Sequence, residues 1–173
     1  MIDFKNMDLM DSLDLAISIE EEARERYQTF AELVGKRYQG DASDFFETMA
    51  SNEEQHRNQL SARRRKIFGD TPRKIDLSDC WDLAETPAAS AARTFMSAKQ
   101  AMEMALAAET KARLFFEEAL LQISQPDVRS LFSELAAEEI KHQCALQRRL
   151  DLLPKGDTGP DLSEEDLDEP PAL

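Results

Sequence analysis

The two histidines of this chain each end the same pattern, Phe46-x-x-Met49-Ala50-x-x-Glu53-x-x-His56 and Phe132-x-x-Leu135-Ala136-x-x-Glu139-x-x-His142. A Glu and a His three residues apart lie on one face of an α-helix, close enough to share one ion. The shared phenylalanine and alanine positions indicate that the two stretches are related, because composition alone would not repeat them. The pattern therefore predicts two similar helices that each offer a pair of metal ligands.

The composition favours helix along almost the whole chain. Its 173 residues suit one domain with a substantial core, and only five of them are glycine. Alanine, leucine, glutamate, glutamine, arginine and methionine are plentiful, and these residues have high helix propensity. A net charge of −14 argues against a nucleic-acid partner and against an anionic membrane surface. We expect an all-α protein with neither partner.

The cysteines and the N-terminus narrow the class of protein further. Cys80 and Cys144 are isolated, so a thiolate-held zinc, a rubredoxin-type iron site and a disulfide framework are unsupported. Residues 1–10 include acids and no apolar stretch of the kind that a signal peptide needs. No run approaches the roughly 18 apolar residues of a membrane span. We expect a soluble cytoplasmic protein.

Apolar residues recur with the 3.6-residue period of an amphipathic helix in four long segments. We expect helices over about 8–37 and 42–68, with a turn at Gly40-Asp41 between them. A third is expected over about 88–124, and a fourth after the break at Gln125-Pro126-Asp127, ending near 153. The short turns predict two antiparallel hairpins, joined by a crossover over about 69–87 that Trp81 anchors to the bundle.

The composition changes at Pro154. Residues 154–173 contain four Pro, two Gly and seven acids against one Lys, which is typical of a disordered acidic tail. A docking or address peptide is the alternative. We therefore divide the chain into a helical domain over 1–153 and a tail over 154–173.

The repeat extends to the first helix of each hairpin. One contains Glu20-x-x-Ala23-Arg24-x-x-Tyr27 and the other Glu109-x-x-Ala112-Arg113-x-x-Phe116. Each hairpin thus offers one lone Glu and one Glu-x-x-His pair, as expected for a duplicated unit with approximate two-fold symmetry. All of these acids and histidines interrupt apolar stripes and should point into the bundle. The predicted metal ligands are Glu20, Glu53, His56, Glu109, Glu139 and His142.

Four buried carboxylates are very unfavourable unless cations join them. Two divalent cations balance this charge, with Glu53 and Glu139 as bridging ligands, Glu20 and Glu109 as terminal ligands, and one His on each ion. Mixed carboxylate and imidazole ligation suits iron or manganese better than calcium or a closed structural zinc site. We expect two Fe ions, and Mn or Zn could occupy the site in a purified sample.

Residues around the predicted ligands have less certain roles. Glu21, Glu22, Glu54 and Glu138 lie off the stripes and should be solvated or lie behind the ligands, although Glu138 is also four residues from His142. Tyr27 could donate its hydroxyl to a ligating Glu or to bound oxygen, or could simply be a core aromatic. Arg24 and Arg113 either pair with ligand carboxylates or lie on the surface.

The Arg63-Arg64-Arg65-Lys66 run is either a basic patch or a set of cations that suit the C-terminal end of the helix dipole. In so acidic a chain we favour the second interpretation.

The segments Glu20-Glu21-Glu22-Ala23-Arg24-Glu25-Arg26-Tyr27 and Ala50-Ser51-Asn52-Glu53-Glu54-Gln55-His56 resemble those of rubrerythrin-type di-iron carboxylate proteins, in the ferritin-like superfamily. The resemblance covers about 8–153. It implies an up-down-down-up four-helix bundle, a di-iron centre and redox chemistry with dioxygen or peroxide. It also implies a homo-oligomer, with a dimer expected.

Two departures set the chain apart from typical rubrerythrins. It carries no C-terminal rubredoxin domain, so an electron donor would be a separate protein. Ala108, Thr110 and Lys111 flank Glu109, where many rubrerythrins have an additional carboxylate. The chain is therefore closer to stand-alone rubrerythrin-like proteins.

Three functions are compatible with these patterns. The first is a di-iron oxidoreductase that oxidises ferrous iron with dioxygen or reduces peroxide. The second is a protein that binds, stores or delivers iron or another divalent metal without turnover. The third is a helical interaction module whose metal site is structural.

Overall fold

The computed structural model of the protein describes residues 2–72 and 96–153. These residues form four helices and no strand: α1 (Leu9–Val34), α2 (Ala42–Phe68), α3 (Ala98–Leu120) and α4 (Pro126–Leu152). The all-α fold is confirmed. Trp81, the acidic tail and the crossover from residue 73 onward lie outside the described residues.

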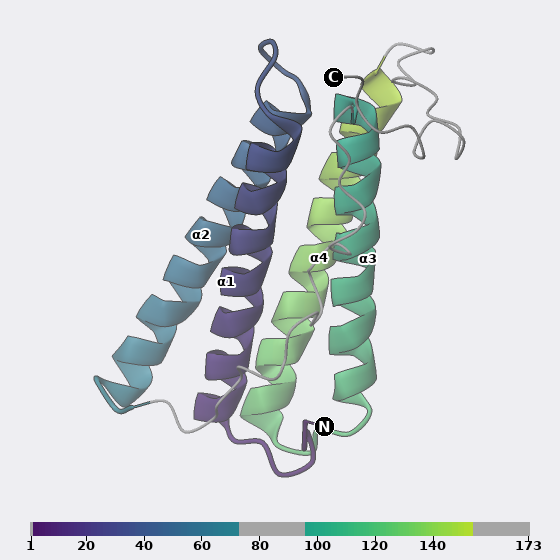
Figure 1. Cartoon of the computed structure of the whole chain (residues 1–173). Helices are drawn as coiled ribbons and strands as arrows, with labels where there is room; N and C mark the ends of the chain where they lie inside the picture. Colours follow the sequence, from purple (N-terminus) through teal and green to yellow (C-terminus); the bar gives the residue numbers. More distant parts are fainter. Residues whose placement is uncertain (1, 73–95, 154–173) are drawn as a thin grey trace, which may run out of the picture.

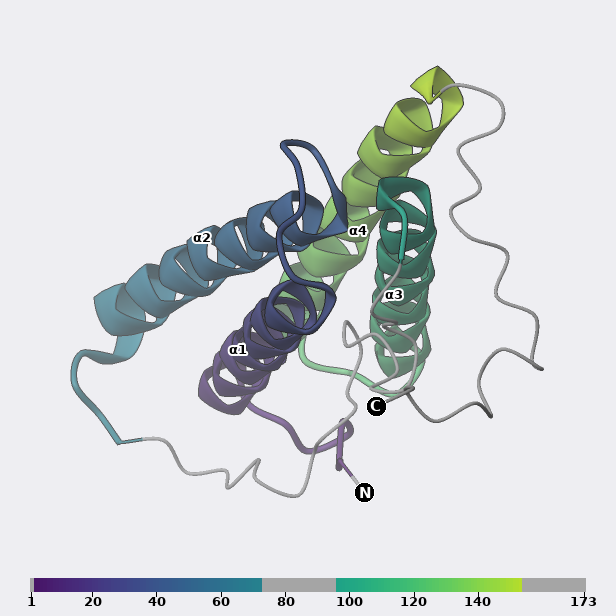
Figure 2. The same ribbon diagram turned by 45° about the horizontal axis from the view of Figure 1, so that its top comes forward.

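The helices pair as two antiparallel hairpins, α1 with α2 and α3 with α4. In Figure 1, α1 and α4 run upward and α2 and α3 run downward, which is the up-down-down-up order of a ferritin-like bundle. The view in Figure 2 keeps the same pairing, with the two hairpins beside each other. Within the described part of the chain, no helix is long and apolar enough to cross a membrane.

Local chemistry decides where the helices begin and end. Asp8 caps α1 by accepting a hydrogen bond from the Asp11 amide at 2.8 Å. This helix ends at Val34, three residues before the expected Arg37, because Gly35 follows with a φ of 62° that suits glycine.

The third helix also differs from the expected range. It begins at Ala98, where Ser97 and Gln100 form a reciprocal capping box, rather than near residue 88. Residues 88–95 lie outside the described part of the chain. The helix ends at Leu120 instead of Ser124, although Ile123 beyond it is still buried.

The core consists of two apolar clusters, one towards each end of the bundle. The first joins the N-terminal half of α1 to the C-terminal half of α3 and the N-terminal half of α4, and includes Ile17, Phe116 and Phe132. The second joins the other halves of these helices to the start of α2, and includes Phe30, Phe46 and Leu146. The predicted metal ligands lie between these clusters in the sequence of every helix.

The first turns of α1 are more deeply buried than a single apolar stripe predicts. Leu13, Leu15, Ile17 and Ile19 are all at most 1% exposed, so both neighbouring faces of the helix are covered. Helices covered on most sides lose the simple amphipathic pattern.

The same stretch holds a buried ion pair that the sequence analysis did not anticipate. Asp14 is 0% exposed, and its carboxylate accepts hydrogen bonds from Nε and Nη2 of Arg64 on α2, the second at 3.2 Å. The helix-dipole interpretation is therefore wrong for Arg64. It remains compatible with Arg65 and Lys66, which lie in the last turn of α2. Arg63 instead links the hairpins, since its Nη1 lies 2.7 Å from Oε2 of Glu134 on α4.

Candidate metal centre

The first hairpin brings together a triad of Glu20 from α1 with Glu53 and His56 from α2. One ligand atom from each residue can be chosen so that all three lie within 4.8 Å of one another. Nδ1 of His56 lies 3.5 Å from Oε2 of Glu20 and 3.4 Å from Oε2 of Glu53. Both glutamates are at most 4% exposed, so their carboxylates face the interior as the apolar stripes predict.

The second hairpin repeats the arrangement with Glu109 from α3 and with Glu139 and His142 from α4. Their ligand atoms also lie within 4.8 Å of one another. Nδ1 of His142 is 3.2 Å from Oε2 of Glu109 and 3.7 Å from Oε2 of Glu139. Glu109 is 4% exposed and Glu139 is 2% exposed. The lone Glu and the Glu-x-x-His pair of each hairpin therefore converge, as their sequence spacing predicts.

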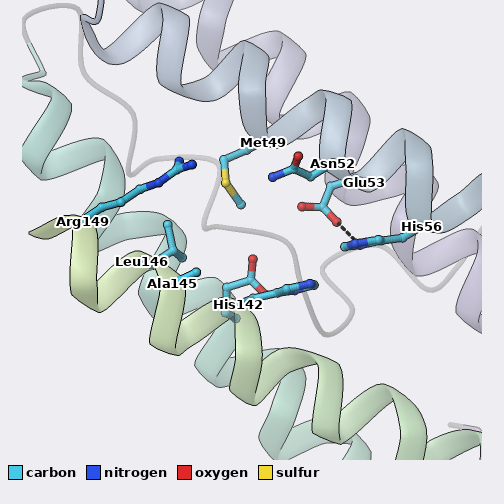
Figure 3. A pocket seen from close by; sticks show the side chains of 9 residues that line it. Met49, Asn52, Glu53, His56, His142, Ala145, Leu146 and Arg149 are labelled. Carbon is cyan, nitrogen blue, oxygen red and sulfur yellow. Dashed lines mark hydrogen bonds and ion pairs between the residues drawn. The ribbon is translucent and has the colours of Figure 1, made fainter.

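The two triads meet through their histidines. The imidazole rings of His56 and His142 stack with centroids 4.7 Å apart and an angle of 3° between their planes. Figure 3 shows the two rings approaching each other from α2 and α4. The bundle thus brings all six predicted ligands to one layer, while the bridging roles of Glu53 and Glu139 remain predictions.

Burial changes the protonation of the first triad. Burial, together with the nearby Glu53 carboxylate, raises the pKa of Glu20 to about 8. The adjacent carboxylates of Glu20 and Glu53 raise the pKa of His56 to about 11. Oε2 of Glu20 is buried and has no hydrogen-bond partner at normal distance. A cation fits this triad, because it would displace the protons and satisfy the buried oxygen.

The lone glutamate of the second triad behaves differently from Glu20. Burial favours the neutral form of Glu109, but hydrogen bonds from Glu139 and His142 outweigh it and lower the pKa of Glu109. The pKa values of the two lone glutamates, though related in sequence, are therefore shifted in opposite directions.

Two cavities adjoin the triads, both between α2 and α4. The larger, which we name the Arg149 cavity, has a volume of about 270 Å³. It is lined by Met49, Asn52, Glu53, His56, Glu109, His142, Ala145, Leu146 and Arg149. The smaller, the Glu138 cavity, has a volume of about 150 Å³ and includes Glu20, His56, Arg63, Glu134 and Glu138 in its lining. A small reactant could thus reach the layer from either side.

The neighbouring acids mostly form ion pairs. Glu54 pairs with Arg57 at 2.7 Å and with Arg24 at 3.3 Å. Glu22 is only 9% exposed and pairs with Arg26 at 3.5 Å, so the expectation of a solvated side chain is wrong for this residue.

The other uncertain residues have simpler surroundings. Arg113 pairs with Glu117 at 2.9 Å, outside the triads. Tyr27 is 1% exposed and stacks on Phe46, with ring centroids 6.1 Å apart, which is the packing of a core aromatic. Its predicted hydroxyl donation remains a prediction.

Sequence analysis missed three residues beside the triads. Nε2 of Gln143 donates a hydrogen bond to the carbonyl oxygen of Glu109 at 3.0 Å, which ties α4 to α3 next to the ligands. Asn52 and Arg149 line the larger cavity. The sequence offered two signals: Asn52 is next to Glu53, and Arg149 follows His142 by two helical turns. Neither position distinguishes these residues from ordinary surface side chains.

The rubrerythrin family model matches residues 11–150, which cover α2, α3, nearly all of α1 and α4, and both triads. The chain belongs to the rubrerythrin family. This membership agrees with the duplicated Glu and Glu-x-x-His pattern and with two groups of residues that could each hold a metal ion.

Two solved structures are similar to this chain in fold. An uncharacterized conserved protein from Magnetospirillum magnetotacticum MS-1 is 25% identical, with a TM-score of 0.64 over 86% of this chain and 97% of the other. A hypothetical protein from Pyrococcus furiosus is 21% identical, with a TM-score of 0.50 over 88% of this chain and 96% of the other, and shares the fold. No curated protein matches the chain significantly.

Proposed function

We propose that the protein is a di-iron carboxylate oxidoreductase that reacts ferrous iron with dioxygen or peroxide. The observation that carries this proposal is the convergence of four carboxylates, each at most 4% exposed, and two stacked imidazoles in one layer of a rubrerythrin-family bundle. Buried carboxylates at this density need positive charge among them. The stacked rings join the two triads into a single centre.

The donor set fits a pair of divalent ions. Glu20, Glu53 and His56 would hold one, and Glu109, Glu139 and His142 the other. Carboxylate and imidazole donors together suit iron and manganese. The chemistry that two bound ferrous ions supply is electron transfer to dioxygen or peroxide.

The remaining residues prepare the layer for this role. The two apolar clusters flank it along the bundle and limit the entry of bulk water from the ends. His56 and Glu20 hold protons in the metal-free protein, and these must leave when cations bind. The cavities between α2 and α4 offer the oxidant a route to the layer.

Stopped-flow absorption tests the proposal directly. Protein loaded anaerobically with ferrous iron is mixed with dioxygen or with peroxide, and ferric absorbance should appear within a single turnover. Glu53→Gln should abolish the signal, while Glu54→Gln should keep it, because Glu54 lies outside the triads and pairs with Arg57 and Arg24. A flat trace at two irons per chain, counted by elemental analysis, would exclude oxidoreductase chemistry.

The acid-lined Glu138 cavity favours a second candidate, in which the protein binds, stores or delivers iron or another divalent metal. Repeated mixing separates the two. An oxidoreductase supplied with fresh ferrous iron, or with a separate electron-donor protein, turns over many times. A carrier or store stops when its sites are full and releases its metal to a chelator or an acceptor protein.

A further inference from the structure

The Arg149 cavity is larger than dioxygen or peroxide requires. Its volume of about 270 Å³ equals that of roughly nine water molecules at about 30 Å³ each. Passage of a diatomic oxidant would need a small fraction of this space. The volume is instead close to the lower end of the range for cavities that bind small organic ligands.

The cavity carries an apolar wall and a polar end. Met49 on α2 and Leu146 on α4 are each 4% exposed and belong to the second core cluster. Asn52 and Arg149 extend towards the same space from opposite helices, as Figure 3 shows. Within the part of the chain that the structure describes, Arg149 has no acidic partner. A guanidinium in this situation is suited to bind a carboxylate.

Arg149 lies away from the histidines. It follows His142 by seven residues on α4, and a rise of 1.5 Å per residue separates them by about 10 Å along the helix axis. On α2, Met49 precedes His56 by the same seven residues, while Asn52 precedes it by four and lies nearer the triads. Leu146 lies between His142 and Arg149 in the sequence and borders the cavity. A molecule that bound Arg149 with one end would therefore contact Met49 and Leu146 and extend towards the triads.

The two cavities differ in charge. The lining of the Glu138 cavity includes three acids and one arginine, Arg63, and Nη1 of this arginine already lies 2.7 Å from Glu134 Oε2. The Arg149 cavity has only Glu53 and Glu109 as acids, both members of the triads. An anionic ligand is therefore favoured on the Arg149 side alone.

We propose that the Arg149 cavity binds a small monocarboxylate with an aliphatic chain, whose carboxylate contacts Arg149 and whose chain packs on Met49 and Leu146. This proposal rests on the di-metal centre proposed above, because the carboxylates of Glu53 and Glu109 line the cavity and would repel an anion until divalent cations bind them. Binding should accordingly depend on metal.

Calorimetric titration of zinc-loaded protein with octanoate tests the proposal, because zinc is redox-silent. Octanoate should bind, while acetate, octan-1-ol and octylammonium should bind at least about tenfold more weakly, since each lacks either the chain or the negative charge. Arg149→Gln should weaken octanoate binding about tenfold. Arg148→Gln is the matched control, since this exposed neighbour is outside the cavity lining, and it should leave binding unchanged.

Metal content and thermal stability, measured on the same samples, separate this proposal from the proposed function. Equal binding of octanoate and octan-1-ol, or equal losses in the Arg148 and Arg149 variants, would overturn the carboxylate site while leaving the metal centre intact. If protein that holds two zinc ions per chain does not bind octanoate, the carboxylate site is likewise overturned and the metal centre is left intact. Failure to load zinc would instead refute the metal centre, and with it the neutralisation on which this site depends.

Discussion

Replacing Arg64 with methionine removes the guanidinium that pairs with the Asp14 carboxylate, which is 0% exposed, and it keeps most of the aliphatic packing. The buried carboxylate then loses the positive charge that offsets its removal from water. Breaking a buried pair in this way typically costs about 3–5 kcal/mol, and we expect a loss of unfolding free energy in this range.

The same reasoning predicts that removing both charges restores stability. Urea unfolding of the metal-free protein at pH 7, followed by circular dichroism, measures the free energy of unfolding of each variant. The double variant Asp14→Asn/Arg64→Met should recover much of the loss at pH 7, because no buried charge remains.

A neighbouring arginine provides the control for this experiment. Arg65 belongs to the same basic run, but its side chain is 77% exposed and pairs at 3.4 Å with Asp70, which is 87% exposed. Arg65→Met should leave the unfolding free energy unchanged within error. The reasoning would be refuted by a loss below about 1 kcal/mol for Arg64→Met at pH 7, or by a double variant that is no more stable than Arg64→Met.

Three further predictions concern the centre and the helices. The pKa values of Glu20 and His56 are both raised, so the folded metal-free protein holds more protons than the unfolded chain. Its melting temperature, measured by calorimetry, should therefore fall from pH 6 to pH 9. A melting temperature that rises over this range would contradict the prediction. The affinity for zinc should increase over the same pH range, because the bound protons become easier to displace. A competition titration with a chelator measures this affinity. An affinity that does not depend on pH would refute proton displacement. Ser97→Ala removes the capping box of α3 and should cost about 1 kcal/mol in urea unfolding, whereas Ser133→Ala, on an exposed part of α4, should cost much less.

The fold and the ligand set could be predicted because both depend on short-range spacing. The 3.6-residue period and the repeated Glu-x-x-His pattern describe residues on one helix, where geometry follows from the sequence separation alone. Duplication of the hairpin then predicted which lone Glu belongs to which pair. The triads of Glu20 with His56 and of Glu109 with His142 have this pairing.

Errors occurred where partners come from other helices. Arg64 was interpreted as one cation of the Arg63-Arg64-Arg65-Lys66 run at the end of a helix. Only the packing of α1 against α2 brings it to the buried Asp14. Glu22 was expected to be solvated or to lie behind the ligands, and it is 9% exposed because the bundle covers that face of α1. Leu15 and Ile19 point to a different face of α1 from Leu13 and Ile17, and all four are buried because α1 is covered on more than one face.

The sequence by itself determined the four helices, the two hairpins and the six residues that converge. Helical periodicity and turn formation depend on residues that are close together in the chain, so the sequence is enough to predict them. Only the tertiary structure decided how the two triads meet through the stacked histidines, that the pKa values of Glu20 and Glu109 are shifted in opposite directions, and that Arg149 and Asn52 share a cavity with the triads. These features depend on the relative placement of helices far apart in the chain. The spacing of residues along one helix carries no information about that placement.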